Sequence, residues 1–283
     1  MTGLMVYLGI GIAPDRYAFL LLFLALILGR FKSFVFDFFP FIFLWLSYDF
    51  LRGFADNLTP RAHFIELINL ERWAFDGIIP TVELQKHFFS LNHLSVLDYL
   101  ATITYFLHFA LALGFAFFLW LYRKSYFREF ATAILLLSYA GWITYLIYPA
   151  APPWLAQKEG YLVGVTKILN IALISFPERL NLPTIYTSFN PNEVAAMPSM
   201  HAAYPFLILL FLISYFRWRG LLFLPYVLLV WFSIVYLGEH YVIDIIGGVI
   251  YALTFFTLAK YVLHNVKLTT ALKFIKKPWS SRT

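Results

Sequence analysis

The chain is organised around residues 192–248, which contain the stretches AMPSMH at 196–201 and GEHYVIDIIGG at 238–248. Both stretches place ionisable residues at the ends of otherwise apolar runs. In the second, His240 and Asp244 are four residues apart, so on a helix their side chains would lie on the same face. A carboxylate there can hold one imidazole nitrogen and leave the other free for chemistry. The spacing therefore predicts an activated histidine.

The first stretch predicts a helix start that binds an anion. Pro198 is suited to an opening helical turn, whose unpaired N–H groups and positive dipole end attract a group such as phosphate. His201 would lie beside that anion, and Ser199 is interpreted as part of the cradle that holds it. Together, the two stretches predict a phosphate-handling site with two histidines.

These residues resemble the motifs of a known family. PSMH at 198–201 followed by His240-x-x-x-Asp244 is similar to the second and third motifs of the type 2 phosphatidic acid phosphatase superfamily, integral membrane enzymes that act on lipid phosphates. YPAAPPW at 148–154 resembles, more narrowly, the inositol phosphorylceramide synthase (aureobasidin-resistance) branch. The resemblance covers roughly residues 45–260.

The resemblance also implies a role for each of three residues. His240 would attack phosphorus to form a phosphohistidine, Asp244 would orient it and stabilise its charge, and His201 would protonate the leaving oxygen. No cofactor and no catalytic metal are expected, because the chain has no cysteine and no His-x-x-x-His or His-Glu-x-x-His element. A serine hydrolase is not expected, because no Gly-x-Ser-x-Gly turn occurs.

Composition places the chain in a membrane. Of its 283 residues, 61% are hydrophobic and only 13% are charged, which is too apolar for a soluble domain. The net charge of +6 comes from basic residues in short clusters between apolar runs, so it fits orientation in a bilayer rather than a nucleic-acid partner. No small-residue cleavage site follows Asp15 and Arg16, which predicts that the first span is not removed.

Seven apolar runs approach the length of about 20 residues that a membrane-spanning helix needs. They predict an all-α polytopic bundle, with a six-helix core like that of the superfamily and one added N-terminal helix. The runs are residues 12–30, 34–52, 96–121, 129–149, 198–216, 220–237 and 241–263. A single catalytic domain over 1–283 is expected, divided into an N-terminal helical hairpin (12–52), interfacial helices (53–95), a catalytic bundle (96–263) and a basic tail (264–283).

The short basic clusters predict an orientation. If seven helices alternate, Arg30 and Lys32, the cluster at 123–128, the pair at 217 and 219 and the C-terminal tail all fall on one side. That side should be cytoplasmic by the positive-inside rule. Both histidine stretches then face the opposite side, whether periplasmic, extracellular or lumenal.

The segments between the spans predict short elements. Residues 53–95 carry too many charges for a span, so we expect an amphipathic helix around 64–73 and a second short helix from Pro80. These could form a lid, or could simply pack over the bundle. Prolines within 150–197 exclude a continuous helix but permit an amphipathic piece around 160–175.

Two cationic positions of the family pattern are missing. The first motif, K-x-x-x-x-x-x-R-P, has no match near 150–160, and Ser233 is followed by Ile234 where arginine is usual. A phosphate monoester, with nearly two negative charges, would suffer most from this loss, whereas a phosphodiester carries one. Our hypothesis is a phosphodiester headgroup lipid as substrate, or replacement cations from among Arg61, Arg72, Lys86, Lys158, Lys167 and Arg179.

The expected function is therefore transfer of a phosphoinositol-like headgroup from a membrane phospholipid to a lipid hydroxyl. The alternatives are hydrolysis of a lipid phosphate or polyprenyl diphosphate at the same site and, from another class, a lipid transporter or flippase. His108, in an apolar span, would either bind substrate or brace another helix. The substrate-binding candidates are Ser199, His108, Tyr105, Asp49, Arg52, Trp154, Tyr204 and Arg179.

Overall fold

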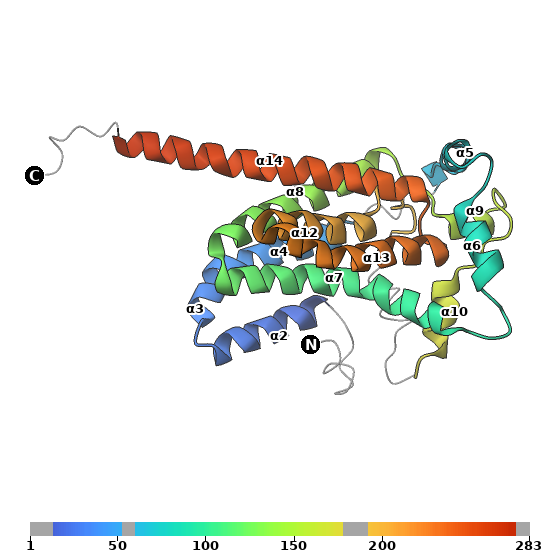
Figure 1. Ribbon diagram of the computed structural model, residues 1–283, viewed down its shortest axis with the longest axis horizontal. Helices are drawn as coiled ribbons and strands as arrows, with labels where there is room; N and C mark the ends of the chain where they lie inside the picture. The colour runs from blue at the N-terminus through green and yellow to red at the C-terminus, as the bar shows by residue number, and fades with distance from the viewer. Residues whose placement is uncertain (1–13, 53–59, 178–191, 276–283) are drawn as a thin grey trace, which may run out of the picture.

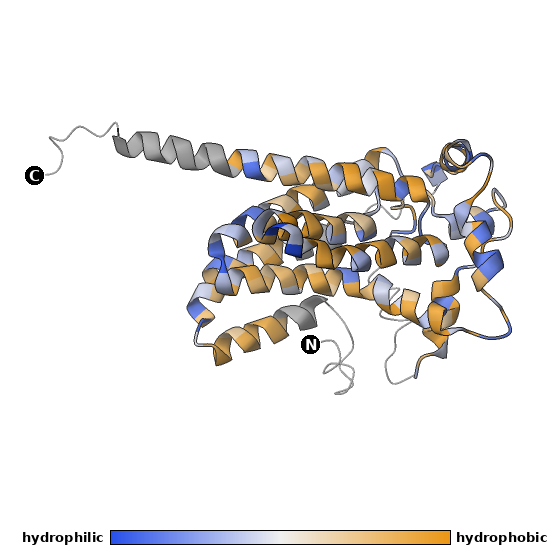
Figure 2. Cartoon of the chain, viewed as in Figure 1, coloured by the Kyte–Doolittle hydropathy of each residue, from blue (hydrophilic) through white to orange (hydrophobic). Residues whose placement is uncertain are grey.

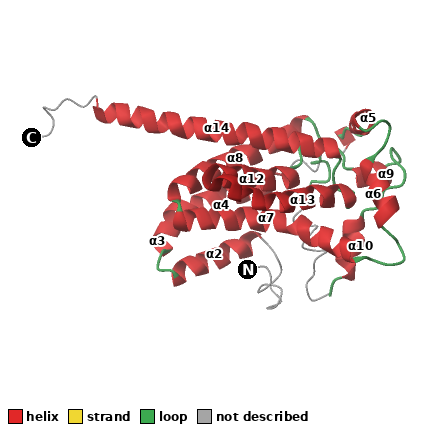
Figure 3. Cartoon of the chain, viewed as in Figure 1, coloured by secondary structure: helices red, strands yellow, loops and turns green. Residues whose placement is uncertain are grey.

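The computed structural model describes residues 14–52, 60–177 and 192–275. Over these ranges the chain forms helices joined by loops and contains no β-strand (Figure 3). The predicted all-α class is confirmed.

Long helices lie side by side along one axis of the molecule (Figure 1). A helix forms at each of the seven predicted apolar runs. In chain order these helices are α2 (Pro14–Ile27), the π-helix η1 (Phe34–Phe38) with α4 (Phe39–Arg52), α7 (Val96–Tyr122), α8 (Lys124–Ile147), α12 (Met200–Phe216), α13 (Leu224–Tyr236) and α14 (Val242–Ile275). Within the described ranges, four stretches are long and apolar enough to cross a membrane: Val96–Tyr122, Lys124–Ile147, Met200–Tyr236 and Val242–Val262. The third combines α12, the 3-10 segment η4 (Arg217–Phe223) and α13.

Two helices extend beyond the predicted apolar runs, because hydropathy marks a span and not the end of its helix. Helix α8 begins at Lys124 rather than 129, since basic residues are good helix formers. Helix α14 continues to Ile275, so the segment from 264 is not simply a tail. Residues 264–275 contain no Pro or Gly that would stop the helix.

Short helices gather at one end of the bundle, opposite α3 (Phe31–Ser33), as Figure 1 shows. Helices α5 (Ile65–Ala74) and α6 (Pro80–Phe88) confirm the two elements expected within 53–95. Helix α9 spans Pro153–Lys158, and α10 spans Ile168–Ser175. The amphipathic helix predicted around 160–175 therefore forms only in its second half, as α10. The first half is not helical, because Gly160 and Gly164 adopt positive φ angles of 81° and 89°, which end regular helix.

Aromatic side chains form much of the core. Phe34 and Phe38 on η1 each lie 5.7 Å, between ring centroids, from Trp120 on α7, and Phe38 stacks on Phe127 of α8 at 5.3 Å. Phe36, between the first two, is 80% exposed. Apolar residues also cover the outside of the bundle (Figure 2), as expected for a surface that meets lipid.

Candidate active site

The first histidine stretch forms a capped helix start. Ser199 is the N-cap of α12, and its Oγ accepts a hydrogen bond from the Ala202 N–H at 3.2 Å. Pro198 therefore lies before the helix and not in its opening turn, which corrects the prediction. Its carbonyl accepts from the Tyr145 hydroxyl of α8 at 2.7 Å. Ser199 is fully buried, so its hydroxyl serves as the cap of the helix that carries His201.

The second histidine lies outside its helix, whereas His201 is the second residue of α12. Helix α14 begins at Val242, so His240 stands in the preceding turn and does not share a helix face with Asp244. The two side chains still meet, because Asp244 folds back over the helix start. Its Oδ2 accepts from the Tyr241 N–H at 2.8 Å and lies 3.4 Å from His240 Nδ1. The predicted contact is confirmed, and its predicted helical basis is wrong.

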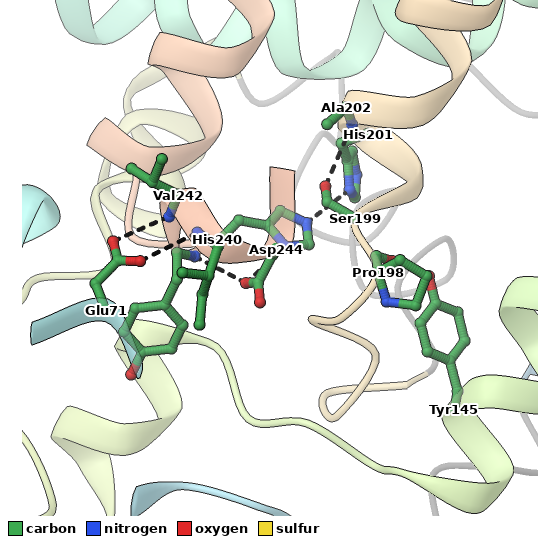
Figure 4. Close-up of polar contacts among 11 residues, drawn as sticks. Glu71, Tyr145, Pro198, Ser199, His201, Ala202, His240, Val242 and Asp244 are labelled. Atoms are coloured by element: carbon green, nitrogen blue, oxygen red, sulfur yellow. Dashed lines mark hydrogen bonds and ion pairs between the residues drawn. The ribbon is translucent and has the colours of Figure 1, made fainter. Parts of the chain in front are cut away.

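The two histidines face each other. His201 Nδ1 lies 3.0 Å from His240 Nε2, as Figure 4 shows. Since Asp244 Oδ2 is an acceptor, we infer that His240 carries its proton on Nδ1, which leaves Nε2 as the acceptor from His201. His240 is 4% exposed and Asp244 is fully buried, so a shielded carboxylate holds a nearly buried imidazole.

Close approach of α12 and α14 brings the histidines together. The Ser199 N–H donates to the Asp244 carbonyl at 3.0 Å, which joins the two stretches through their backbones. A Cβ on Gly248 would lie 2.5 Å from the Ser199 carbonyl oxygen and 3.4 Å from Ala202 Cβ. Glycine is therefore required at this crossing.

Gly248→Ala should separate α12 from α14 and lower both stability and turnover, because the added methyl meets backbone that cannot move aside. The expected loss is about 1–3 kcal/mol of unfolding free energy. Gly114→Ala in α7 is the matched control, since no atom lies within 4 Å of a Cβ there. The melting temperature in detergent measures the difference, and equal values for the two variants would contradict the close crossing.

Two residues of α7 pack against His201. The Tyr105 ring stacks on it with centroids 4.4 Å apart at an interplanar angle of 26°, and the His108 ring lies 4.3 Å away. His108 Nδ1 donates to the Tyr105 carbonyl, which holds the His108 ring in place. The two predicted roles of His108 were to bind substrate or to brace another helix, and this geometry favours the second. Tyr204 lies deeper, 3% exposed, and its hydroxyl pairs with Ser138 Oγ at 2.7 Å.

A pocket opens beside the histidine pair. Its wall consists of Tyr105, Tyr145, Pro152, Trp154, Asn192, Glu193, Ala195, Ala196, Met200, His201, Glu239 and His240. Among the described residues, no partner exists for two buried donors of this wall, Asn192 Nδ2 and Trp154 Nε1. Buried N–H groups are normally paired, so these two are candidate donors to a ligand in the pocket.

Lys167 is the predicted replacement cation that touches a pocket residue. Its Nζ lies 3.4 Å from the centroid of the Trp154 ring. Burial lowers the pKa of Lys167, while Glu239 and Glu193 act to raise it. Arg179 lies outside the described residues, as do the side chains of Asp49 and Arg52 on α4.

The sequence reading did not assign Asn192, Glu193, Glu239 or Glu71 to the site. Asn192 and Glu193 precede the first histidine stretch in a proline-rich loop and share no periodic pattern with it. The burial of Glu71 could have been predicted from the sequence. It lies four residues after Leu67 and three after Ile68, which places its carboxylate on the apolar face of α5.

Comparisons with known proteins agree with this geometry. The model of the PAP2 superfamily matches residues 65–258. The chain is 29% identical over 239 residues to the phosphoinositol dihydroceramide synthase of Bacteroides thetaiotaomicron, covering 81% of this chain and 77% of that protein. It is 28% identical over 177 residues to the inositol phosphorylceramide synthase of Candida albicans, covering 59% of this chain and 36% of that protein. No solved structure gives a significant match.

The superfamily match begins at the start of α5 and ends within α14, so it contains both histidine stretches and the pocket. Apolar helices of spanning length, together with this membrane enzyme family, make the protein an integral membrane protein. The chain belongs to the PAP2 superfamily, in agreement with the resemblance carried by its histidine stretches.

Proposed function

We propose that this protein is a membrane lipid phosphotransferase. It moves a phosphoinositol-like headgroup from a phospholipid donor to a lipid hydroxyl through a phosphohistidine on His240. The observation that carries the proposal is the pair formed by partly exposed His201 and buried His240, 3.0 Å apart between ring nitrogens, with Asp244 behind His240. The names of the curated relatives support a lipid phosphotransferase of this kind.

The proposed reaction has two balanced steps. In the first, His240 Nε2 attacks phosphorus, the bond from phosphorus to the glyceride oxygen breaks, and that oxygen takes a proton from His201. In the second, His201 removes the proton of the acceptor hydroxyl, the acceptor oxygen attacks phosphorus, and the P–N bond breaks. Since the two nitrogens face each other, a phosphoryl group entering between them would have the nucleophile and the acid on opposite sides, as in-line displacement requires. Substrate binding must therefore move the two rings apart.

The pocket favours a phosphodiester with hydroxyl groups. Glu193 and Glu239 bring negative charge to its wall, which disfavours a dianionic monoester beside them. The same carboxylates can accept hydrogen bonds from a polyol. Asn192 and Trp154 supply neutral N–H donors for an oxygen that carries a single charge. These features support transfer of a polyol phosphate over hydrolysis of a phosphate monoester, which is the second candidate within the PAP2 superfamily.

Label transfer tests this proposal. Purified protein is incubated with phosphatidylinositol labelled in its headgroup, with ceramide or diacylglycerol as acceptor. We expect label in a new lipid that depends on the acceptor. Label found only in water-soluble products would make the protein a hydrolase, and movement of intact lipid without a chemical product would make it a transporter.

Lys167→Gln should raise KM for the anionic donor about tenfold with little change in kcat, because it removes a cation at the pocket edge and leaves the histidines untouched. Lys158→Gln is the control, since Lys158 is exposed in the same segment. Steady-state kinetics over a range of donor concentrations measures both constants. Equal KM values for the two variants would contradict the proposed place of Lys167 at the donor headgroup.

We further propose that the 1–283 chain acts as one catalytic unit with its site on the non-cytoplasmic side and its C-terminus in the cytoplasm. Helices α5, α6, α9 and α10 gather at one end of the bundle (Figure 1). The pocket includes Trp154 of α9 in its wall. Basic residues cluster at the other end, where Lys124 pairs with Asp37 at 2.6 Å and Arg30 donates to the Leu121 carbonyl. This separation supports the positive-inside orientation.

A further inference from the structure

A carboxylate from helix α5 closes the start of α14. Glu71 has 0% exposure, which is rare for a carboxylate and requires compensating partners. Its Oε1 accepts from the Val242 N–H at 3.0 Å, and its Oε2 accepts from the Ile243 N–H at 3.1 Å. A helix start leaves such N–H groups without partners and favours negative charge beside them. Figure 4 shows this two-oxygen contact next to the catalytic turn.

The same turn carries the groups proposed for catalysis. The Tyr241 N–H donates to Asp244 Oδ2 at 2.8 Å, and that oxygen lies 3.4 Å from His240 Nδ1. The two peptide N–H groups that Glu71 holds belong to the residues between Tyr241 and Asp244. A shift of this turn would change the direction of the imidazole, so the contact with Glu71 controls the geometry of the nucleophile.

We propose that Glu71 is a positioning residue, whose ionised carboxylate holds the first turn of α14 so that Asp244 keeps His240 aligned for attack on phosphorus. This inference rests on the proposed function and extends it by linking α5 to the reaction. Glu71 acts through the backbone of α14 and needs no contact with substrate.

The protonation state of Glu71 gives a readout that a purely structural role would not. Burial raises the pKa of Glu71 to about 7; the two backbone N–H groups oppose this shift and the charge of Asp244 adds to it. Among the described residues, Tyr241 in the turn also interacts electrostatically with Glu71 and with Arg72 on helix α5. As pH falls through about 7, Glu71 takes up a proton and becomes a weaker, neutral acceptor.

The test compares kcat of the unmodified protein with kcat of Glu71→Gln across pH. Glutamine resembles protonated glutamate, so the ratio of the two rates should be near one at about pH 6, where Glu71 is mostly neutral. The ratio should rise to about 10- to 100-fold at about pH 8. Taking a ratio removes any pH dependence that both proteins share. A ratio that is independent of pH, whether one or large, would overturn the proposal.

Glu66→Gln on the same helix is the matched control, because Glu66 is exposed and pairs only locally with His63 at 3.1 Å; its ratio should stay near one. Hydrogen exchange of the amides from Tyr241 to Asp244 provides a second readout that needs no activity. It should accelerate in Glu71→Gln at about pH 8 and not in Glu66→Gln. If the protein lacks transferase activity, the exchange measurement still tests whether Glu71 holds the first turn of α14, and unchanged exchange would overturn that part of the proposal.

If Glu71→Gln does not fold, Glu71→Asp takes its place. It keeps the charge but is too short to reach both N–H groups, so a normal rate at about pH 8 would contradict the proposal.

Discussion

Replacing His240 with alanine should reduce transfer by at least about a thousandfold, because no other group can then receive the phosphoryl group at the centre of the site. Its Nε2 faces His201 at 3.0 Å, and its other nitrogen faces a buried carboxylate, so among the histidines whose side chains are described it has a second imidazole opposite it and a carboxylate behind it. Initial rates of labelled product formation measure the loss.

His87→Ala is the control for the removal of a histidine. His87 lies on α6 with 65% of its side chain exposed and should tolerate alanine without loss of rate. A His240→Ala protein that folds, binds donor and retains more than about a tenth of the rate would contradict the role of His240 as nucleophile.

Asp244→Asn should lower kcat by roughly 100- to 10,000-fold while the fold is kept. Asparagine has nearly the same size and can still accept from the Tyr241 N–H, because both residues are good acceptors at helix starts. It cannot stabilise the charge that develops on His240 during attack, and its amide can favour the wrong imidazole tautomer.

The double variant gives the sharper comparison. If Asp244 acts only through His240, then His240→Ala and Asp244→Asn together should be no slower than His240→Ala alone. Rates are compared at saturating donor, and melting temperatures show whether each protein is folded. Fully additive losses would mean that Asp244 acts on substrate independently of His240.

Much of the fold could be predicted because it follows from local patterns. Apolar runs located each long helix, and the charges within 53–95 indicated the two short ones, α5 and α6. Helix ends were less accurate, as at Lys124 and Ile275, because a helix can extend beyond its apolar part. Phe34 and Phe38 illustrate how helical spacing sorts apolar side chains: four residues apart, they point into the core, while Phe36 between them points outward.

The proximity of His240 and Asp244 was predictable from the sequence, but the geometry of the site was not. Both histidine stretches were recognised, yet Pro198 lies before the Ser199 cap of α12 instead of in its opening turn, and His240 precedes α14 instead of lying on it. Spacing alone cannot tell a helix face from a capping turn, because four residues satisfy both. The contact of Glu71 with Val242 joins positions 171 residues apart, and no local pattern carries such information.

The most direct test of the account is to trap the enzyme intermediate. Protein is incubated with headgroup-labelled phosphatidylinositol in the absence of a lipid acceptor, quenched, digested and analysed by mass spectrometry, beside His240→Ala and His201→Ala. The account predicts an acid-labile phosphoinositol adduct on the peptide that contains His240, its absence from His240→Ala, and its slower formation in His201→Ala. An adduct on any other residue, or undiminished turnover by His240→Ala with no adduct, would contradict catalysis through a phosphohistidine at His240.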